Sequence, residues 1–240
     1  MKDKRRSTVD PALFLTDLER KPAVLSELAD AIDRGDVLEG VPDDVDRVLF
    51  LGMGSSTYAA GVAAARLRSR GVEAVAELAS SDLLPAADPR TLVVAISASG
   101  SSRETLAAVR SYVGRSPLVA MTNVAGSPIT IDADVSVAMH ADTEAGGVAC
   151  RSFQHSLVLL LALEHLLVGT APDLAGTVRL SATACADLLD RRGEWLPAVV
   201  EALDGPDGSW VVAPFRRLAS AQQSALMLRE CPRRASVACE

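Results

Sequence analysis

The stretch Arg47-Val-Leu-Phe-Leu-Gly-Met-Gly-Ser-Ser-Thr57 decides the fold class. Its apolar run is short and continuous, which is typical of a parallel strand buried on both faces. The glycines that follow mark a tight turn, and the Ala-rich residues 59–70 have the composition of a helix. A strand, a glycine turn and a helix in this order predict an α/β protein.

The same design appears a second time farther along the chain. The apolar run at residues 91–96 leads into Ser97-Ala-Ser-Gly-Ser-Ser102, and we expect a helix from about residue 103 to 113. The pattern also predicts short strands at 72–78, 117–122 and 135–139, and a long helix at 149–167. Strands that alternate with helices favour a parallel sheet with helices on its faces.

Helical patterns flank this region. Residues 11–34 read as helix with a break at Pro22, and the chain after residue 172 reads as helix to about 203, where Pro197 marks a kink or a helix start. Beyond the turn cluster Gly205-Pro-Asp-Gly208, a strand is expected at 210–213 and a helix at 218–230. One strand cannot form a sheet, so either a second domain is cut short here or this strand pairs with another chain.

Composition excludes several classes of protein. The 240 residues are 49% hydrophobic and 3% aromatic with a formal net charge of -7, which argues against disorder and against nucleic-acid binding. The longest apolar run, residues 157–163, is too short to cross a membrane. No apolar run follows the basic residues near the N-terminus, so a signal peptide is not expected.

The cysteines are too scattered to form a metal site. Cys150, Cys185, Cys231 and Cys239 show no ligand spacing with one another or with histidine. Reduced thiols in a cytoplasmic protein that holds no metal are therefore expected.

Hydroxyl side chains follow two strands at the point where each ends. Gly54-Ser-Ser-Thr57 and Ser97-Ala-Ser-Gly-Ser-Ser102 both precede helices, whose N-termini favour anions. Because ligands of open parallel sheets bind at the carboxyl ends of the strands, these turns predict a shared phosphate site. The alternative is that these Ser and Thr residues are ordinary helix N-caps. A dinucleotide cofactor is not expected, because Thr57 replaces the third glycine of G-x-G-x-x-G.

At these residues the sequence resembles the sugar isomerase (SIS) domain family, and in particular the isomerase domain of glucosamine-6-phosphate synthase and its deglycase and deaminase relatives. The resemblance rests on the following segments: Gly52-Met-Gly-Ser-Ser-Thr-Tyr-Ala-Ala60, Ala95-Ile-Ser-Ala-Ser-Gly-Ser-Ser102, Glu77-Leu-Ala-Ser80, Thr122-Asn-Val-Ala-Gly-Ser-Pro128 and Thr143-Glu144 with Phe153. It implies a flavodoxin-like three-layer αβα domain with five parallel strands, a homodimer, and a ketose or aldose phosphate as ligand.

The resemblance also implies roles for individual residues. It assigns the phosphate to Ser56, Ser97, Ser99 and Ser102. It assigns sugar contacts to Gly54, Ser55, Ala98, Gly100 and Ser101. The synthases usually have Gln at the position of Ala98 and Glu at that of Ser101, and Ala149-Cys-Arg151 replaces their Ser-Thr-Lys stretch. With these changes, we expect this chain to keep phosphate binding rather than the sugar specificity of the synthase.

The implied organisation is a helical arm (1–44), an SIS domain (45–172), a helical connector (173–207) and the truncated start of a second SIS-like subdomain (208–240). The chain begins Met1-Lys-Asp3 without a glutaminase domain, and the catalytic Glu of the family falls at or beyond residue 240. Only Glu144 and Glu240 are candidates here for a catalytic base.

Two functions therefore stay open. The first is a phosphosugar isomerase, deaminase or deglycase whose site is completed by a further segment or by a partner chain. The second is a non-catalytic phosphosugar sensor or regulatory subunit that uses the same serines.

Overall fold

The computed structural model describes residues 10–240, so Met1-Lys-Asp3 and the first part of the predicted arm lie outside the described residues. Its centre is a parallel sheet in the order β2-β1-β3-β4-β5, which confirms the predicted α/β class and the five strands. The strands are β1 (Arg47–Gly52), β2 (Glu73–Leu78), β3 (Thr91–Ile96), β4 (Leu118–Thr122) and β5 (Val135–Ala138).

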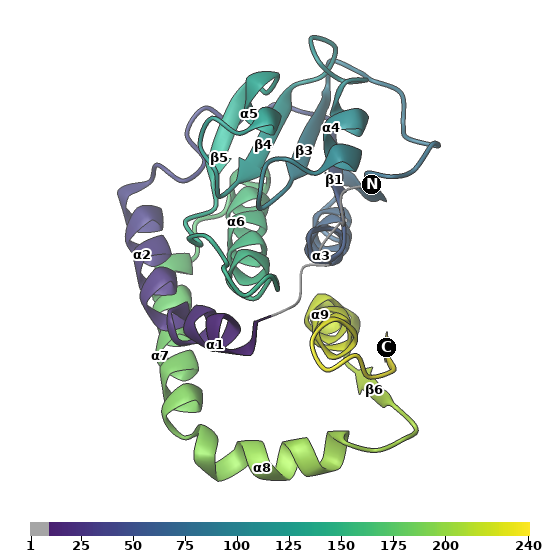
Figure 1. The fold of residues 1–240 in the computed structure, drawn as a ribbon. Helices are drawn as coiled ribbons and strands as arrows, with labels where there is room; N and C mark the ends of the chain where they lie inside the picture. The colour runs from purple at the N-terminus through teal and green to yellow at the C-terminus, as the bar shows by residue number, and fades with distance from the viewer. Residues whose placement is uncertain (1–9) are drawn as a thin grey trace.

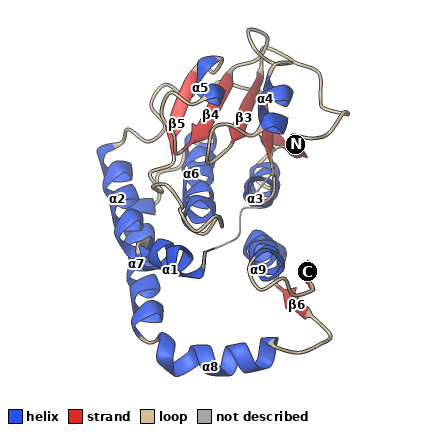
Figure 2. Ribbon diagram, in the orientation of Figure 1, coloured by secondary structure: helices blue, strands red, loops and turns tan. Residues whose placement is uncertain are grey.

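Helices cover both faces of this sheet (Figures 1 and 2). On one face lie α3 (Ser55–Arg68) and α6 (Arg151–Val168); on the other lie the shorter α4 (Arg103–Val109) and α5 (Pro128–Ile131). All six residues of β3 are buried, as expected of a strand covered on both sides. The continuous apolar runs in the sequence therefore reflect this three-layer packing.

The strand order places the ends of β1 and β3 side by side. β2 lies on one side of β1, whereas β3, β4 and β5 follow on the other, so the order reverses between β1 and β3. The two strands pair in parallel with Gly52 opposite Ile96. Both turns singled out in the sequence consequently start at the same level of the same sheet edge.

The arm packs against a helix from the second half of the chain. It consists of α1 (Pro11–Glu19) and α2 (Lys21–Arg34), which break at Arg20, next to the predicted break. Apolar residues of α2 pack against α7 (Leu174–Asp190). The helix α8 (Arg192–Leu203) contains Pro197 and buries none of its residues. It crosses the lower part of the view in Figure 1 and leads from α7 toward β6 (Ser209–Val212).

The last segment forms a second, two-stranded sheet. β6 pairs in parallel with β7 (Ser236–Cys239), with Trp210 opposite Val237. Between them lie the 3-10 turn η1 (Phe215–Arg217) and α9 (Leu218–Glu230), which packs against α3. The expected strand thus has a partner within the chain, and the sequence analysis missed β7. Among the described residues, no helix has both the length and the apolar character to cross a membrane.

Candidate functional site

The candidate site lies at the carboxyl ends of β1 and β3. In the first turn, Gly54 has φ 54° and ψ -125°, a conformation that suits glycine. Gly52 allows the following helix to come close, since a Cβ there would lie 2.8 Å from the Cβ of Ser56. The hydroxyl of Thr57 donates to the Gly52 carbonyl at 2.8 Å. The chain therefore turns directly from the strand into α3.

The N-terminus of α3 has no side-chain cap. Ser55 and Ser56 stand at its first positions, and both are half-buried. A helix end carries a partial positive charge of about half a unit, which favours an anion. The first turn thus offers an uncapped helix end beside two hydroxyl side chains.

The second turn is fixed to the neighbouring strand by its backbone. The Ser97 amide donates to the Met121 carbonyl at 3.0 Å, and the carbonyl of Ala98 accepts from the Asn123 amide at 3.1 Å. The carbonyl of Gly100 accepts from the Ile129 amide at 3.0 Å. These bonds join residues 97–100 to β4 and α5.

Gly100 is required by close packing beneath the second turn. It has φ 63°, and a Cβ at this position would lie 1.9 Å from the Oγ of Ser127. Ser127 is buried, and its hydroxyl has no hydrogen-bond partner among the described residues. No side chain larger than hydrogen fits at Gly100 unless Ser127 moves.

The hydroxyls of the second turn have different surroundings. Ser97 is buried, whereas Ser99 and Ser101 are exposed and bonded to each other, Oγ to Oγ, at 3.0 Å. Ser102 is the N-cap of α4, because its Oγ accepts from the Thr105 amide at 3.3 Å. The alternative interpretation of these residues as caps is therefore confirmed for Ser102, while α3 lacks such a cap.

A third segment, between β5 and α6, borders the second turn. The side chain of Asn123 accepts from the Ala141 amide at 3.0 Å and donates to the Asp142 carbonyl at 3.1 Å. His140 and Asp142 both have φ 55°, which is uncommon for residues with a side chain. Asn123, whose amide bonds the second turn, thus also holds this segment.

Glu144 lies in this third segment and caps α6. Its Oε1 accepts from the amides of Cys150 at 2.5 Å and Arg151 at 2.6 Å. The carboxylate is thereby engaged at the helix N-terminus. The other candidate base, Glu240, directly follows β7 of the two-stranded sheet and not a strand of the sheet whose edge carries the serines.

A buried ion pair ties the arm to the third segment. The Nη2 of Arg151 lies 2.9 Å from the Oδ1 of Asp17, and the exposed fractions of these side chains are 1% and 4%. Asp17 also accepts from the Gly146 amide at 2.7 Å. The residue types give no sequence signal for this pair, because its partners are 134 positions apart.

Cys150, just before α6, is a buried thiol. Burial raises the pKa of the Cys150 thiol to about 12, and the nearby Glu144 carboxylate adds to the shift. The thiol is therefore neutral near pH 7 and a poor nucleophile. All four cysteines are free. Among residues 10–240, no three His, Cys, Asp or Glu side chains are grouped to hold a metal ion.

Comparisons with known proteins agree with the pattern in the sequence. The sequence profile of the SIS domain matches residues 43–166. Glutamine–fructose-6-phosphate aminotransferase [isomerizing] of Aeropyrum pernix is 32% identical over 168 residues, which cover 67% of this chain and 27% of that protein. The protein of the same name from Halobacterium salinarum is 40% identical over 88 residues, which cover 36% of this chain and 14% of its own.

Solved structures share the fold at lower identity. A putative phosphosugar isomerase from Silicibacter pomeroyi superimposes with a TM-score of 0.75 at 21% identity and covers 95% of this chain and 71% of its own. Glucosamine-6-phosphate deaminase from Thermotoga maritima gives a TM-score of 0.66 at 19% identity, with 93% and 70% covered. The chain spans only about a quarter of the length of the Aeropyrum relative.

Proposed function

Because the chain belongs to the SIS domain family, we propose that it binds a sugar phosphate at the two serine turns. One observation carries this proposal: two hydroxyl-rich turns start at the same level of adjacent strands, and the helix after the first turn has no side-chain cap. A phosphate there would receive hydroxyl donors and a helix N-terminus without a basic side chain.

The proposed ligand contacts are those that the resemblance to the SIS domain family implies. Ser56, Ser97 and Ser99 hold the phosphate, and Ser102 contributes from its place as the cap of α4. The sugar lies against the backbone and small side chains of Gly54, Ser55, Ala98, Gly100 and Ser101. Small residues at these positions leave space for a polar ring or an open-chain sugar.

For the reaction, we propose chemistry of the isomerase, deaminase or deglycase type on a ketose or aminosugar phosphate. The names of the Aeropyrum and Thermotoga proteins support this class. Moving a proton between adjacent carbons requires a base. Since Glu144 is engaged as a helix cap, the base would come from another segment or from a partner chain.

The alternative is a phosphosugar sensor that binds without turnover. The engagement of Glu144 at α6 favours this alternative, because the serine turns themselves contain no titratable group. Incubation with fructose 6-phosphate and glucosamine 6-phosphate separates the two functions. Product formation supports the enzyme, whereas saturable binding without any product supports the sensor.

The proposed organisation keeps the boundaries 1–44, 45–172, 173–207 and 208–240, with a homodimer as the assembly. The dimer is supported by apolar side chains that α8 leaves exposed, Leu196, Val199 and Val200 among them. Sedimentation velocity measures the mass in solution, and a monomer at all concentrations would contradict the dimer.

Thermal unfolding with and without ligand tests the site itself. A sugar phosphate present at 100 times its dissociation constant stabilises the folded state by about 2.7 kcal/mol. We expect fructose 6-phosphate to raise the melting temperature, unphosphorylated fructose to leave it unchanged, and Ser97→Ala with Ser99→Ala to remove the effect. A matched control replaces two exposed helical serines, Ser181→Ala with Ser224→Ala. An equal ligand effect in both double variants would reject the site.

A further inference from the structure

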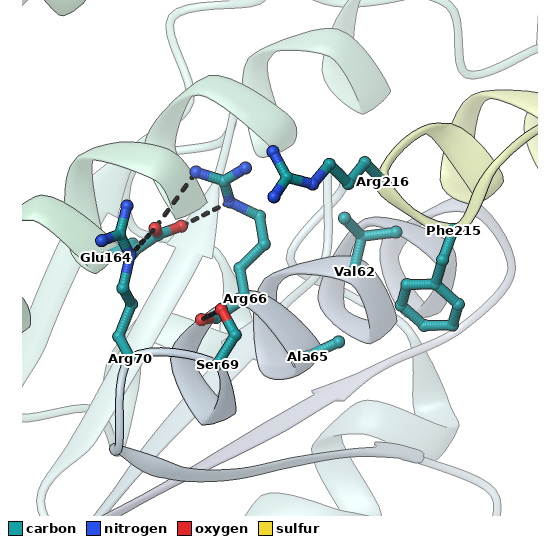
Figure 3. A pocket seen from close by; sticks show the side chains of 8 residues that line it. All are labelled: Val62, Ala65, Arg66, Ser69, Arg70, Glu164, Phe215 and Arg216. Carbon is teal, nitrogen blue, oxygen red and sulfur yellow. Dashed lines mark hydrogen bonds and ion pairs between the residues drawn. The ribbon is translucent and has the colours of Figure 1, made fainter.

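A cluster of arginines lies at the far end of α3 from the serine turns. We propose that it is a second anion site, which takes a phosphate ester with a small apolar body. The site is a cavity of about 520 Å³ between α3, α6 and η1 (Figure 3). This volume falls within the range usual for small-molecule sites, roughly 300–1,000 Å³. The inference does not depend on the proposed sugar phosphate.

Positive charge exceeds negative charge in this cavity. Among the described residues, Glu164 is the only carboxylate that lines the cavity, and its side chain is 5% exposed. Arg66 binds Glu164 through two hydrogen bonds, of 2.5 Å and 3.1 Å, and the Nε of Arg70 lies 3.9 Å from the same carboxylate. Arg216 also lines the cavity. Three guanidinium groups and one carboxylate thus line this cavity, in a chain whose net charge is -7.

The arrangement of the guanidinium groups suits an anion. Figure 3 shows the side chain of Arg216 directed toward that of Arg66, while Arg66 and Arg70 flank Glu164. Arg216 forms no ion pair with any carboxylate of residues 10–240. Guanidinium groups bind phosphate through paired hydrogen bonds. A dianion beside Arg216 would offset the repulsion between Arg216 and the guanidinium of Arg66, toward which it is directed (Figure 3).

An apolar recess continues from the charged cavity. A second cavity of about 160 Å³ shares Val62, Arg66, Glu164 and Arg216 with the first and extends along Leu157 and Leu160 of α6. The half-exposed ring of Phe215 also lines the charged cavity. An anion that carries a small aromatic or aliphatic group would therefore fill both cavities, whereas free phosphate would fill only the first.

This site is separate from the serine turns. α3 begins at Ser55, and Arg66 follows eleven positions later, a distance of about 16 Å along the helix axis at 1.5 Å per residue. One small ligand cannot contact both places. The two ends of α3 would then bind two anions by different means.

The inference is tested by calorimetry, which measures phosphate ester binding to a variant whose second serine turn lacks two of its hydroxyls. In Ser97→Ala with Ser99→Ala, we expect phenyl phosphate to bind more tightly than inorganic phosphate, and phenol not to bind. Adding Arg70→Gln or Arg216→Gln should weaken phenyl phosphate at least tenfold, about 1.4 kcal/mol. Both arginines are exposed, so these variants should fold, which their circular dichroism will verify. Arg110→Gln is the matched control and should bind normally, because Arg110 directly follows α4 at the opposite face of the sheet.

Two results would overturn the second site. One is the absence of phenyl phosphate binding in the serine background. The other is binding that Arg70→Gln and Arg216→Gln weaken no more than Arg110→Gln does, since this would reveal only a general charge effect. The serine site is judged separately, by whether Ser97→Ala with Ser99→Ala removes the response to fructose 6-phosphate and Arg70→Gln leaves that response in place.

Discussion

The two serine turns have the same sequence design but different structures. The turn before α3 bonds mainly to itself and leaves its helix uncapped, whereas the turn before α4 is bonded to β4 and α5 and ends in the cap Ser102. The first is an open helix end, and the second is a loop held in place before any ligand arrives. A serine next to a helix N-terminus can therefore cap the helix, as Ser102 does, or leave the helix end uncapped, as at the start of α3.

The largest expected effect comes from breaking the anchored turn at Gly100. In Gly100→Ala the new Cβ overlaps the Oγ of Ser127 and the residue keeps a positive φ. Overpacking and left-handed backbone together should destabilise the protein by about 2–5 kcal/mol, measured by urea unfolding. Adding Ser127→Gly should restore part of this loss. Gly61→Ala, which meets open space inside α3, is the control and should be neutral or slightly stabilising.

The free energy of unfolding should depend on pH through His155 of α6 and not through the two serine turns. Neither Gly54–Thr57 nor Ser97–Ser102 contains an ionisable side chain. By contrast, His155 bonds the carbonyl of Met139 at 2.8 Å, and burial lowers its pKa to about 4. The unfolded chain takes up this proton first, near pH 6.5, so the folded state binds fewer protons between the two pKa values.

The free energy of unfolding should therefore be highest above pH 6.5 and fall as the pH drops toward 4. From pH 7.5 to pH 5 the expected loss from His155 is about 2 kcal/mol, measured by urea unfolding at each pH. His155→Gln should show a smaller loss over this interval, whereas His140→Gln, at an exposed position, should keep it. If His155→Gln and the wild type have identical pH profiles, the assignment to His155 is wrong.

A smaller effect should separate the capped helix from the uncapped one. Ser102→Ala removes the hydrogen bond to the Thr105 amide and should cost about 1 kcal/mol. Ser55→Ala removes no cap bond from α3 and should change the free energy of unfolding by less than about 0.5 kcal/mol. Equal losses in the two variants would show that both helices depend on serine in the same way.

Ser56→Ala should have the smallest effect on stability, and it should still lower the affinity for fructose 6-phosphate. Ser56 lies at the uncapped end of α3, so Ser56→Ala should leave the melting temperature of the free protein unchanged within about 1 °C. If its hydroxyl contacts the phosphate, the affinity for fructose 6-phosphate should fall about three- to tenfold, as for one lost hydrogen bond. Calorimetry measures this ratio, and unchanged affinity would remove Ser56 from the site.

The strands and turns were predictable because their signals are local. The run at 47–51 was expected as a strand and is found as Arg47–Gly52, and the strand 91–96 agrees at both ends. The helix expected at 103–113 is shorter, because α4 ends at Val109 and the chain then turns toward Gly114. The helix α3 begins at Ser55, earlier than the expected start at residue 59, because serine after glycine is typical of a turn.

The missed features depend on residues that are distant in sequence. The strand β7 is only four residues long and is defined by its pairing with β6. The cap formed by Glu144 and the buried pair of Asp17 with Arg151 arise from how a loop folds back onto a helix. The arginine cavity needs Arg216, which lies 150 positions beyond Arg66. Periodicity and turn composition carry no information on such pairings.

The contact between α2 and α7 has a consequence for how the protein is made. The apolar face of α2, with Leu25 and Ala29, packs against Leu174 and Val178 of α7. These helices are separated by about 140 residues of chain. Because the ribosome adds ~5–20 residues per second, α7 is synthesised about 7–28 seconds after α2. Docking of α2 onto α7 is consequently a late event in biosynthesis, and the apolar face of α2 lacks this partner until then.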